Sequence, residues 1–449
     1  MELENIQNIY FVGIGGIGMS ALARYCKLQG KNVYGYDKTP TKLTKALISE
    51  GILVSFIDNS EDVVSLLLEK EVTQIVYTPA IPESNNILNF FISKGFSVVK
   101  RAKLLGEITR NTTCLAVAGT HGKTTTSAIL GHLLVACNMP VTAFLGGIAE
   151  NYNSNFISNG TSITVVEADE FDRSFLTLNP DIACITSMDA DHLDIYETNH
   201  SIEDAFVEFS KLVPKKENVL YKKGLPLQGQ SVAVLEPADF EAQNVRIENG
   251  GYVFDLKTPK TTLKDLQFYL HGHHNLSNAI TALGMAILVG SPPNCLPKAL
   301  STFKGVQRRF SYKIKRNDLV LIDDYAHHPT EIDALYQAVA EMYPEDKKVI
   351  VFQPHLYTRT RDFIDGFAKS LSQFDEVLLL DIYPAREEPI EGVDSQLLLQ
   401  KITAKKQLIT KEEILPKLQS SSARIKLLVG AGDIGEEVSK ISKKLSKNG

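Results

Sequence analysis

The chain has 449 residues, of which 44% are hydrophobic and 22% are charged, and its formal net charge at pH 7 is −6. This length and composition are typical of a globular protein with two or three domains and exclude a disordered or fibrous protein. The negative charge and the lack of a long basic run argue against nucleic acid or an anionic membrane as the main partner.

The N-terminal sequence and the cysteine content indicate the cellular compartment of the protein. The start MELENIQNIYFVG is acidic and lacks a signal-peptide pattern, and no apolar run reaches the roughly 18 residues that a membrane helix needs. We therefore expect a cytoplasmic protein without membrane insertion. The five cysteines are odd in number and far apart, so we expect reduced packing residues: Cys26, Cys114, Cys137, Cys184 and Cys295.

Short apolar, β-branched segments alternate with helical stretches along the whole chain. This alternation predicts an α/β fold with parallel sheets and crossover helices. Domain breaks are expected near residue 107 and within 304–311. Residues 221–265 hold short strand-like pieces and polar turns, which predict a small antiparallel appendage on the middle domain.

A glycine-rich turn follows the first expected strand, residues 8–12. Gly13 permits a tight turn, Gly15 lets a pyrophosphate approach the backbone, and Gly18 packs the following helix against its strand. Asp37, at the end of the next strand, lies near the position that binds a ribose. The pattern predicts a pyrophosphate site for a nicotinamide, a flavin or a UDP-sugar.

The second glycine turn, GTHGKTTT at 119–126, joins an apolar strand to a helix. We expect the backbone N–H groups of residues 120–123 to point into one concavity, Lys123 to reach the outer phosphates of a nucleoside triphosphate, and Thr124 to hold Mg²⁺. Val117 stands where a standard phosphate loop has its first glycine. The turn therefore indicates a subset of ATP-using proteins.

Acidic and histidine side chains follow the next strands of the middle segment. Glu167 ends a strand at the sheet edge that faces ligands, so it is the expected Mg²⁺ ligand. His192 ends the following strand and is either a metal ligand or a hydrogen-bonded loop residue. Asn275 and Asn278, at i and i+3 on a helix, offer paired amides to an adenine, although Asn275 equally suits a helix cap.

Further candidates follow strands in the last third of the chain. Asp324 suits a ribose hydroxyl and His327 a phosphate. Arginines at the hinge (Arg308 and Arg309) suit the transferring phosphate. A later strand is followed by His355, Arg359 and Arg361, and an arginine there suits a carboxylate. The glycine turn at 430–435 is interpreted as structural, because too little chain follows for another nucleotide-binding unit.

Together these motifs resemble the Mur ligase family over essentially the whole chain. The resemblance depends on eight segments in order: 13–20, 119–126, 167–170, 189–194, 273–279, 308–310, 323–332 and 381–390. It implies three α/β domains: a Rossmann-like UDP-substrate domain (1–106), a central P-loop ATPase with a mostly parallel sheet (107–308), and a Rossmann-like ligase domain that closes over ATP and amino acid (309–449).

The resemblance also implies a reaction: ATP-dependent ligation of L-alanine to the lactyl carboxylate of UDP-N-acetylmuramate through an acyl phosphate, a step of peptidoglycan synthesis, with Mg²⁺ and as a monomer or weak homodimer. The implied catalytic residues are Lys123, His192, Arg309, His327 and Arg359. ATP would be bound by Gly119, Thr120, His121, Gly122, Lys123, Thr124, Thr125, Asn275, Asn278, Arg309 and Asp324. The UDP-substrate would be bound by Gly13, Gly15, Gly16, Gly18, Met19, Ser20, Asp37, Thr78 and His355, and the metal by Thr124, Glu167 and His192.

One departure and three alternatives accompany this interpretation. Leu356 stands where the family commonly has an arginine, which leaves undecided the residue that binds the amino-acid carboxylate or the phosphate there; the candidates to replace it are Arg361 and another residue of the C-terminal domain. A nicotinamide-dependent dehydrogenase would use the first glycine turn and leave the second idle. A murein tripeptide recycling ligase would share the ATPase half, and a non-catalytic nucleotide-binding protein would not need Lys123, Glu167 and His192 together.

Overall fold

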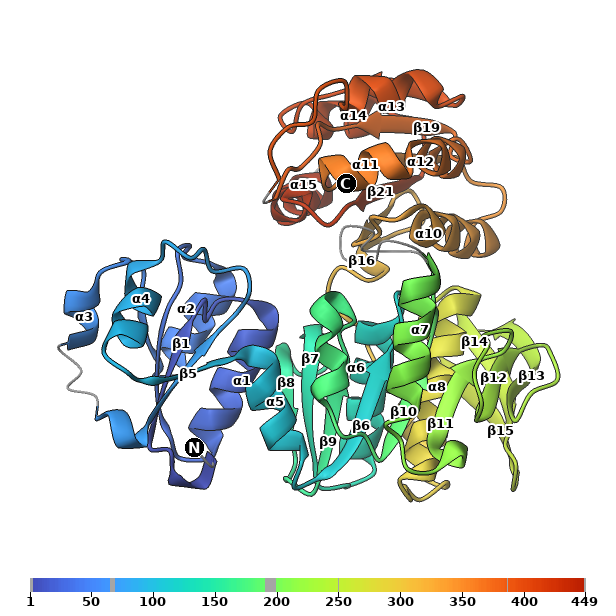
Figure 1. Cartoon of the computed structure of the whole chain (residues 1–449). Coiled ribbons are helices and arrows are strands. Elements are labelled where there is room, and N and C mark those ends of the chain that lie inside the picture. The colour runs from blue at the N-terminus through green and yellow to red at the C-terminus, as the bar shows by residue number, and fades with distance from the viewer. Residues whose placement is uncertain (1–2, 65–68, 190–198, 249, 386, 448–449) are drawn as a thin grey trace. The chain divides into compact units, whose positions relative to one another are not determined.

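The computed structural model describes residues 3–64, 69–189, 199–248, 250–385 and 387–447 (Figure 1). The chain divides into two compact units. Unit 1 contains Met1–Glu248, Val253–Phe268 and Ser277–Lys304, and unit 2 contains Asn249–Tyr252, Tyr269–Leu276 and Gly305–Gly449. The expected α/β class with mostly parallel sheets is confirmed. Among the described residues, no helix has the length and apolar character needed to cross a bilayer.

The first sheet of unit 1 has five parallel strands in the order β3-β2-β1-β4-β5. The strands are β1 Asn8–Val12, β2 Asn32–Tyr36, β3 Leu53–Ser55, β4 Thr73–Tyr77 and β5 Ser97–Lys100. The helices are α1 Ile17–Leu28, α2 Lys42–Ser49, α3 Ser60–Val64, α4 Asn86–Ser93 and α5 Arg101–Thr109. Strand order reverses at β1, and the crevice at such a reversal is where ligands bind in open α/β sheets. The first glycine turn follows β1 directly.

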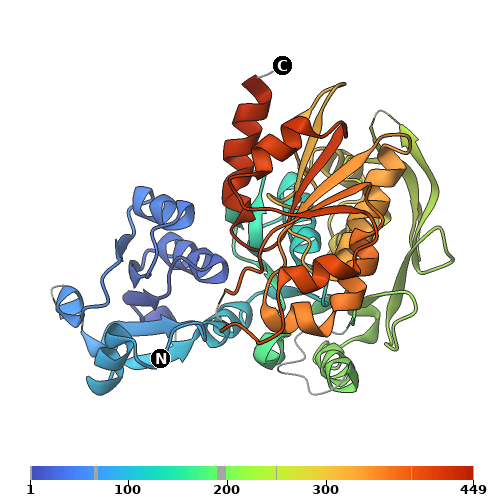
Figure 2. The ribbon, with the colours of Figure 1, turned by 90° about the horizontal axis from the view of Figure 1, so that it is seen from above.

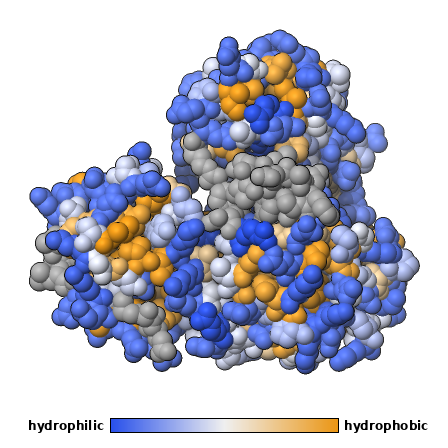
Figure 3. Space-filling view, viewed as in Figure 1, coloured by the Kyte–Doolittle hydropathy of each residue, from blue (hydrophilic) through white to orange (hydrophobic). Residues whose placement is uncertain are grey.

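Part of the surface over this first sheet is apolar. Figure 3 shows apolar residues gathered on the N-terminal part of the chain. Its exposed large apolar side chains are Ile17, Leu28, Ile48, Leu53, Ile57 and Ile92. Exposed apolar side chains are common on folded proteins, so by themselves they assign no partner.

The second sheet of unit 1 has ten strands in the order β15-β14-β13-β12-β11-β10-β6-β9-β7-β8. The strands are β6 Thr113–Ala118, β7 Val141–Ala149, β8 Ser154–Ser158, β9 Ile163–Glu167, β10 Ile182–Ile185, β11 Val219–Lys222, β12 Gln230–Val234, β13 Phe240–Glu248, β14 Gly251–Lys257 and β15 Thr262–Phe268. The helices are α6 Lys123–Ala136, α7 Asn199–Ser210, α8 His273–Leu288 and α9 Leu296–Ser301. Five of the six residues of β6 are buried, as its uninterrupted apolar sequence requires of a central parallel strand.

The expectation of a small antiparallel appendage at 221–265 is wrong for its first part, from β11 to the start of β13. Strands β11, β12 and β13 pair in parallel with one another, and β11 pairs in parallel with β10, so they extend the central sheet. The segments are short and their turns polar, a pattern shared by hairpins and by short parallel extensions. The sequence pattern therefore did not distinguish the two arrangements.

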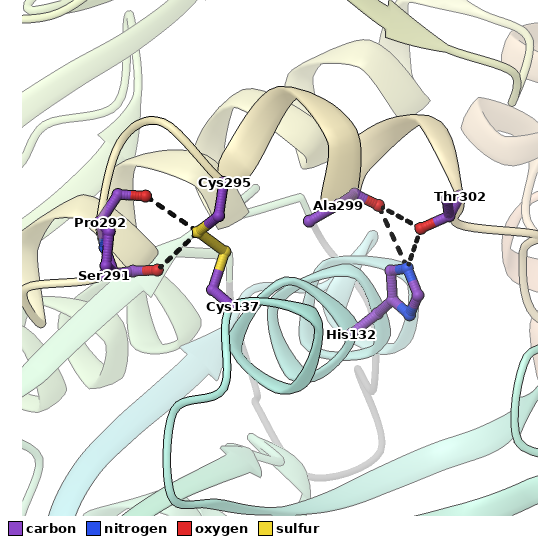
Figure 4. The surroundings of a disulfide bond; sticks show 7 residues. All are labelled: His132, Cys137, Ser291, Pro292, Cys295, Ala299 and Thr302. Carbon is purple, nitrogen blue, oxygen red and sulfur yellow. Dashed lines mark hydrogen bonds between the residues drawn. A yellow bond between two sulfur atoms is a disulfide. The ribbon is translucent and has the colours of Figure 1, made fainter.

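A disulfide joins Cys137, just after α6, to Cys295, just before α9, with the two Cα atoms 5.7 Å apart (Figure 4). The expectation of five reduced cysteines is wrong for these two, because the fold packs α6 against α9 across 158 residues of sequence. Beside the bond, His132 lies within hydrogen-bonding distance of Ala299 O and Thr302 Oγ1. The free cysteines Cys26, Cys114 and Cys184 are buried, and burial raises the pKa of each thiol to about 12.

Unit 2 contains a six-stranded sheet in the order β16-β17-β21-β18-β19-β20, parallel except at its β16 edge. The strands are β16 Ser311–Lys315, β17 Val320–Asp324, β18 Lys348–Phe352, β19 Glu376–Leu379, β20 Lys405–Leu408 and β21 Ile425–Val429. The helices are α10 Pro329–Met342, α11 Tyr357–Asp362, α12 Ile364–Leu371, α13 Ser395–Lys401, α14 Ile414–Ser420 and α15 Ile434–Lys447. In Figure 2, α15 is the red helix that ends at the C-terminus, and it packs its apolar residues against this sheet.

The glycine turn after β21 has a structural role, as expected. Gly430 has φ +145°, and a Cβ there would lie 2.7 Å from Gln353 O. The Gln353 side chain accepts a hydrogen bond from Ile434 N and donates one to Asp433, so it fixes the start of α15. Glycine is required because the chain from β21 to α15 passes directly over β18.

Candidate active site

The first glycine turn is built around Asp37 and Thr78, two residues that the sequence analysis named as substrate-binding candidates. Gly13 has φ +90°, and a Cβ there would lie 2.9 Å from the Thr78 methyl group. Gly15 N donates to Asp37 Oδ2 at 2.7 Å, while Asp37 Oδ1 accepts from Thr39 N. Asp37 therefore shapes the turn through both oxygens.

Helix α1 begins immediately after this turn. Its N-cap is Gly16, which supplies no side-chain hydrogen bond to the first amides, so these remain suited to an anion. Met19 and Ser20 are buried, and the Ser20 hydroxyl donates to Ile17 O and accepts from Asn155 Nδ2. In this structure Met19 and Ser20 pack α1 inside unit 1.

The second glycine turn connects β6 to α6. Gly119 has φ +128° and Gly122 has φ +89°, both in the region that favours glycine. A Cβ on Gly122 would lie 2.6 Å from Asn278 Oδ1. Asn278, one of the two predicted adenine-side amides, therefore contacts the turn. The other, Asn275, is buried and donates from Nδ2 to His271 O at 2.7 Å.

Ser187, two residues after the end of β10, holds the second turn in shape. Thr120 N donates to Ser187 O at 3.3 Å, and His121 N donates to Ser187 Oγ at 2.8 Å. The hydroxyl groups of Thr120 and Ser187 also share a hydrogen bond at 2.8 Å. The expectation that the amides of 120–123 all point into one concavity is wrong for Thr120 and His121. Sequence reasoning missed Ser187, whose only signal was its place directly after a strand.

Lys123, the first residue of α6, is held by an internal carboxylate. Its Nζ donates to both Glu170 oxygens at 2.8 Å and to Gly119 O at 2.7 Å. Burial lowers the pKa of Lys123, but Glu170, Asp169 and Glu167 outweigh this effect, so the pKa is raised and the ammonium stays charged. Glu170 lies in the acidic turn at the end of β9, residues 167–170, of which the sequence analysis singled out only Glu167.

Thr124 and Glu167 lie side by side, as the predicted metal site requires. Thr124 Oγ1 donates to Glu167 Oε1 at 2.9 Å, and Gly146 N donates to Glu167 Oε2 at 2.8 Å. Burial raises the pKa of Glu167, and Lys123 opposes this effect. A hydroxyl and a carboxylate are the oxygen ligands that Mg²⁺ prefers, so the pair fits that ion. The third predicted ligand, His192, lies outside the described residues.

Arg101, at the start of α5, lies between the first glycine turn and the acidic turn. Its Nη2 is 3.6 Å from Asp169 Oδ2, and a Cβ on Gly18 would lie 2.6 Å from its Nη1. A side chain at position 18 would therefore displace this guanidinium. Sequence reasoning did not single out Arg101, because nothing local to RAKLLGEI indicates which side chains it faces.

In unit 2, Asp324 at the end of β17 binds backbone amides. Its two oxygens accept from Phe310 N and Ala326 N, each at 2.7 Å. Burial raises the pKa of Asp324 to about 6, with Arg309 opposing it. The carboxylate thus fixes the segment that follows Arg308 and Arg309, whose guanidinium groups lie 5.0 and 5.1 Å from the centre of the Tyr325 ring.

Unit 2 also gathers four of the predicted catalytic and substrate residues around Glu331. His327 Nδ1 lies 3.2 Å from Glu331 Oε2, and Arg309 Nη1 lies 3.6 Å from Glu331 Oε1. The His327 and His355 rings are 6.2 Å apart, and Arg359 Nη1 is 3.4 Å from His355 Nδ1. Burial lowers the pKa of His327, an effect that Glu331 opposes and Arg359 reinforces. Glu331 is a further residue that sequence reasoning missed.

Leu356, the departure noted in the sequence, is the N-cap of α11 with φ +72°. Leu356 makes no capping hydrogen bond through its side chain. The start of the helix is held by Glu387, whose carboxylate accepts a hydrogen bond from Thr358 N at 3.1 Å. Arg361, the suggested substitute, has a side chain 53% exposed and paired with Asp362. Arg359, by contrast, is buried beside His355, so it is the arginine of this segment placed among the other candidate residues.

Three family models match consecutive parts of the chain. They are the Mur ligase family catalytic domain at residues 8–113, the Mur ligase middle domain at 117–286, and the Mur ligase glutamate ligase domain at 308–434. The chain belongs to the Mur ligase family.

Individual Mur ligases match the chain over its full length. It is 57% identical over 448 residues to the UDP-N-acetylmuramate–L-alanine ligase of Flavobacterium psychrophilum, covering 100% of both chains. It is 46% identical to the enzyme of the same name from Parabacteroides distasonis, covering 100% of this chain and 99% of that one. Among solved structures, the UDP-N-acetylmuramate-alanine ligase of Thermotoga maritima superimposes with a TM-score of 0.81 at 26% identity, covering 98% of this chain and 100% of that one.

A murein peptide ligase from Psychrobacter arcticus superimposes with a TM-score of 0.68 at 18% identity and 98% coverage of both chains. Identity at that level shows the shared fold alone. The chain is therefore similar to the alanine ligases in sequence and fold, and to this peptide ligase in fold.

Proposed function

We propose that this Mur ligase joins L-alanine to the lactyl carboxylate of UDP-N-acetylmuramate and converts ATP to ADP and phosphate, a step of peptidoglycan synthesis. The observation that carries the proposal is the 57% identity over the full chain to an enzyme of that name. Two glycine turns, one after β1 and one after β6, account for two nucleotides on one chain. The tripeptide recycling ligase is the less supported alternative, since the peptide ligase match is one of fold.

The chemistry begins with phosphorylation of the substrate carboxylate, because a free carboxylate does not condense with an amine. The γ-phosphoryl group of ATP moves to a carboxylate oxygen and ADP leaves; the alanine amine then attacks the acyl carbon and phosphate leaves. Lys123 would stabilise the transferring phosphoryl group, and Arg309 would share its charge. Aligning the amine with the acyl phosphate can supply about 7 to 11 kcal/mol of the barrier.

We also propose roles for the other site residues, together with the domain limits, the location and the oligomeric state. Thr124, Glu167 and His192 would hold Mg²⁺, which supplies positive charge to the phosphates when bound. Gly13, Gly15 and the start of α1 would bind the substrate pyrophosphate, and His327, His355 and Arg359 would serve the transferred phosphate and the alanine carboxylate. Domain limits at 106 and 308, a cytoplasmic location and a monomer or weak homodimer complete the proposal.

The test is phosphate release from ATP and Mg²⁺ with UDP-N-acetylmuramate, with and without L-alanine, followed by mass spectrometry of the sugar product. We expect release to require both substrates and the product to gain one alanyl residue. Release that requires a tripeptide in place of L-alanine would favour the recycling ligase. No release with any amine would refute the enzyme assignment.

A further inference from the structure

Lys123, in the second glycine turn (the proposed nucleotide turn), already binds an anion that belongs to the protein, the carboxylate of Glu170. Lys123 Nζ is surrounded by four oxygens: Gly119 O at 2.7 Å, Thr120 O at 3.4 Å and the two Glu170 oxygens at 2.8 Å. An ammonium group has three N–H donors, so these oxygens engage all of them. A triphosphate oxygen can therefore reach Lys123 only by displacing one of the present partners.

Glu170 is the partner most easily exchanged for a phosphate. The two carbonyl oxygens belong to the turn itself and stay with it, whereas Glu170 comes from another segment, 47 residues away. A carboxylate and a phosphate present the same kind of anionic oxygen to an ammonium group. The Glu170 side chain is 1% exposed, so its contact with Lys123 lies inside the protein.

The two neighbouring carboxylates, Glu167 and Asp169, contact other groups. Glu167 accepts from Thr124 and Gly146, and Asp169 faces Arg101 at 3.6 Å. Glu170 is thus the acid of this turn that contacts the lysine through both oxygens. It also starts a 3-10 helix, Phe171–Thr177, in which Arg173 N donates to Glu170 O, so its backbone position is fixed.

We propose that Glu170 is a positioning residue that holds Lys123 in the nucleotide-free protein by occupying the place of a phosphate, and that the triphosphate displaces it. The proposal rests on the ATP site assigned above and goes beyond it, because it names what the nucleotide must exchange with. A displaced Glu170 leaves three carboxylates beside a highly charged nucleotide. Metal-free ATP should therefore bind poorly, and Mg²⁺ should offset the repulsion.

The test is nucleotide binding by Glu170→Gln, measured by calorimetry with ATP in EDTA and with ATP in Mg²⁺, in the absence of UDP-sugar and alanine. Removing the competing charge should tighten metal-free ATP binding about tenfold and reduce the gain that Mg²⁺ provides. The matched control is Glu208→Gln, because Glu208 pairs with Arg173 at an exposed site nearby. The control should bind ATP like the wild type in both buffers.

A second readout reports on Lys123 without nucleotide. Amine acylation followed by peptide mass spectrometry should label Lys123 slowly in the wild type and at least about tenfold faster in Glu170→Gln, since the buried contact with both Glu170 oxygens shields the amine. Glu170→Asp retains the charge but shortens the side chain by one methylene, so it should lose much of the protection while retaining the fold.

Three results would overturn the proposal. Unchanged or weaker metal-free binding in Glu170→Gln would show that Glu170 does not compete with the phosphates. A loss confined to Mg²⁺-containing buffer would make Glu170 a metal ligand instead. Unchanged Lys123 labelling in Glu170→Asp would remove the positioning role. These measurements need only protein and ATP, so failure of the ligation assay leaves them interpretable, and alanine ligation can succeed even if Glu170 has no such role.

Discussion

Replacing Gly119 by alanine tests whether the nucleotide turn is shaped by backbone geometry. Gly119 has φ +128°, and an added Cβ would lie 2.2 Å from Thr186 Oγ1, 2.8 Å from Ser187 N and 2.9 Å from Thr186 N. Two of these neighbours are backbone atoms beyond the end of β10, which cannot rotate away. The turn itself must therefore move, and with it the position of Lys123.

The expected cost has two parts that a control can separate. A side chain in this backbone region costs about 1 to 3 kcal/mol, and steric overlap with a packed strand end adds about 1 to 3 kcal/mol. We expect Gly119→Ala to lower the free energy of unfolding by about 3 kcal/mol. Gly95→Ala supplies the first part alone, because Gly95 has φ +75° and no atom of the described residues lies within 4 Å of its added Cβ; its expected cost is about 1 kcal/mol.

The assay is urea denaturation of both variants, together with ATP affinity by calorimetry in Mg²⁺. Gly119→Ala should bind ATP at least about tenfold more weakly, whereas Gly95→Ala should bind it normally. If Gly119→Ala were no less stable than Gly95→Ala and bound ATP like the wild type, the geometric account of the turn would be refuted.

Three further outcomes are expected. Lys123→Ala should reduce phosphate release by about 10²-fold or more while UDP-sugar affinity stays within about twofold of wild type, and retained turnover would exclude the proposed phosphate contact. Burial lowers the pKa of His271 to about 4, so the free energy of unfolding should fall as pH drops below about 6.5, by about 2 kcal/mol at pH 5. His271→Phe should remove this loss in urea titrations at about pH 8 and pH 5, and an unchanged loss at pH 5 would contradict the prediction. Cys295→Ser should lower the free energy of unfolding by about 2 to 5 kcal/mol, since the disulfide closes a 158-residue loop, and the unreduced, denatured wild type should show three reactive thiols, with five refuting the bond.

Several features of this chain could be predicted because they are local. A strand, a glycine turn and a helix N-terminus occupy about a dozen consecutive residues, and their backbone angles depend on residues within that stretch. Gly13, Gly119 and Gly122 have the positive φ values that such turns need. The same reasoning placed Glu167 at a strand end beside Thr124, because the carboxyl ends of neighbouring parallel strands meet at one sheet edge.

Partner choice within the site was decided by the tertiary structure. Glu170 reaches Lys123 across 47 residues, Ser187 reaches His121 across 66, and Cys137 meets a partner 158 residues away. The sequence by itself determined the glycine turns, the alternation of strands and helices along the chain, and the family. Which of several nearby acids meets the lysine, and which amides of the turn stay available, depend on how helices and strand ends pack, and packing between distant segments leaves no periodic signal in the sequence.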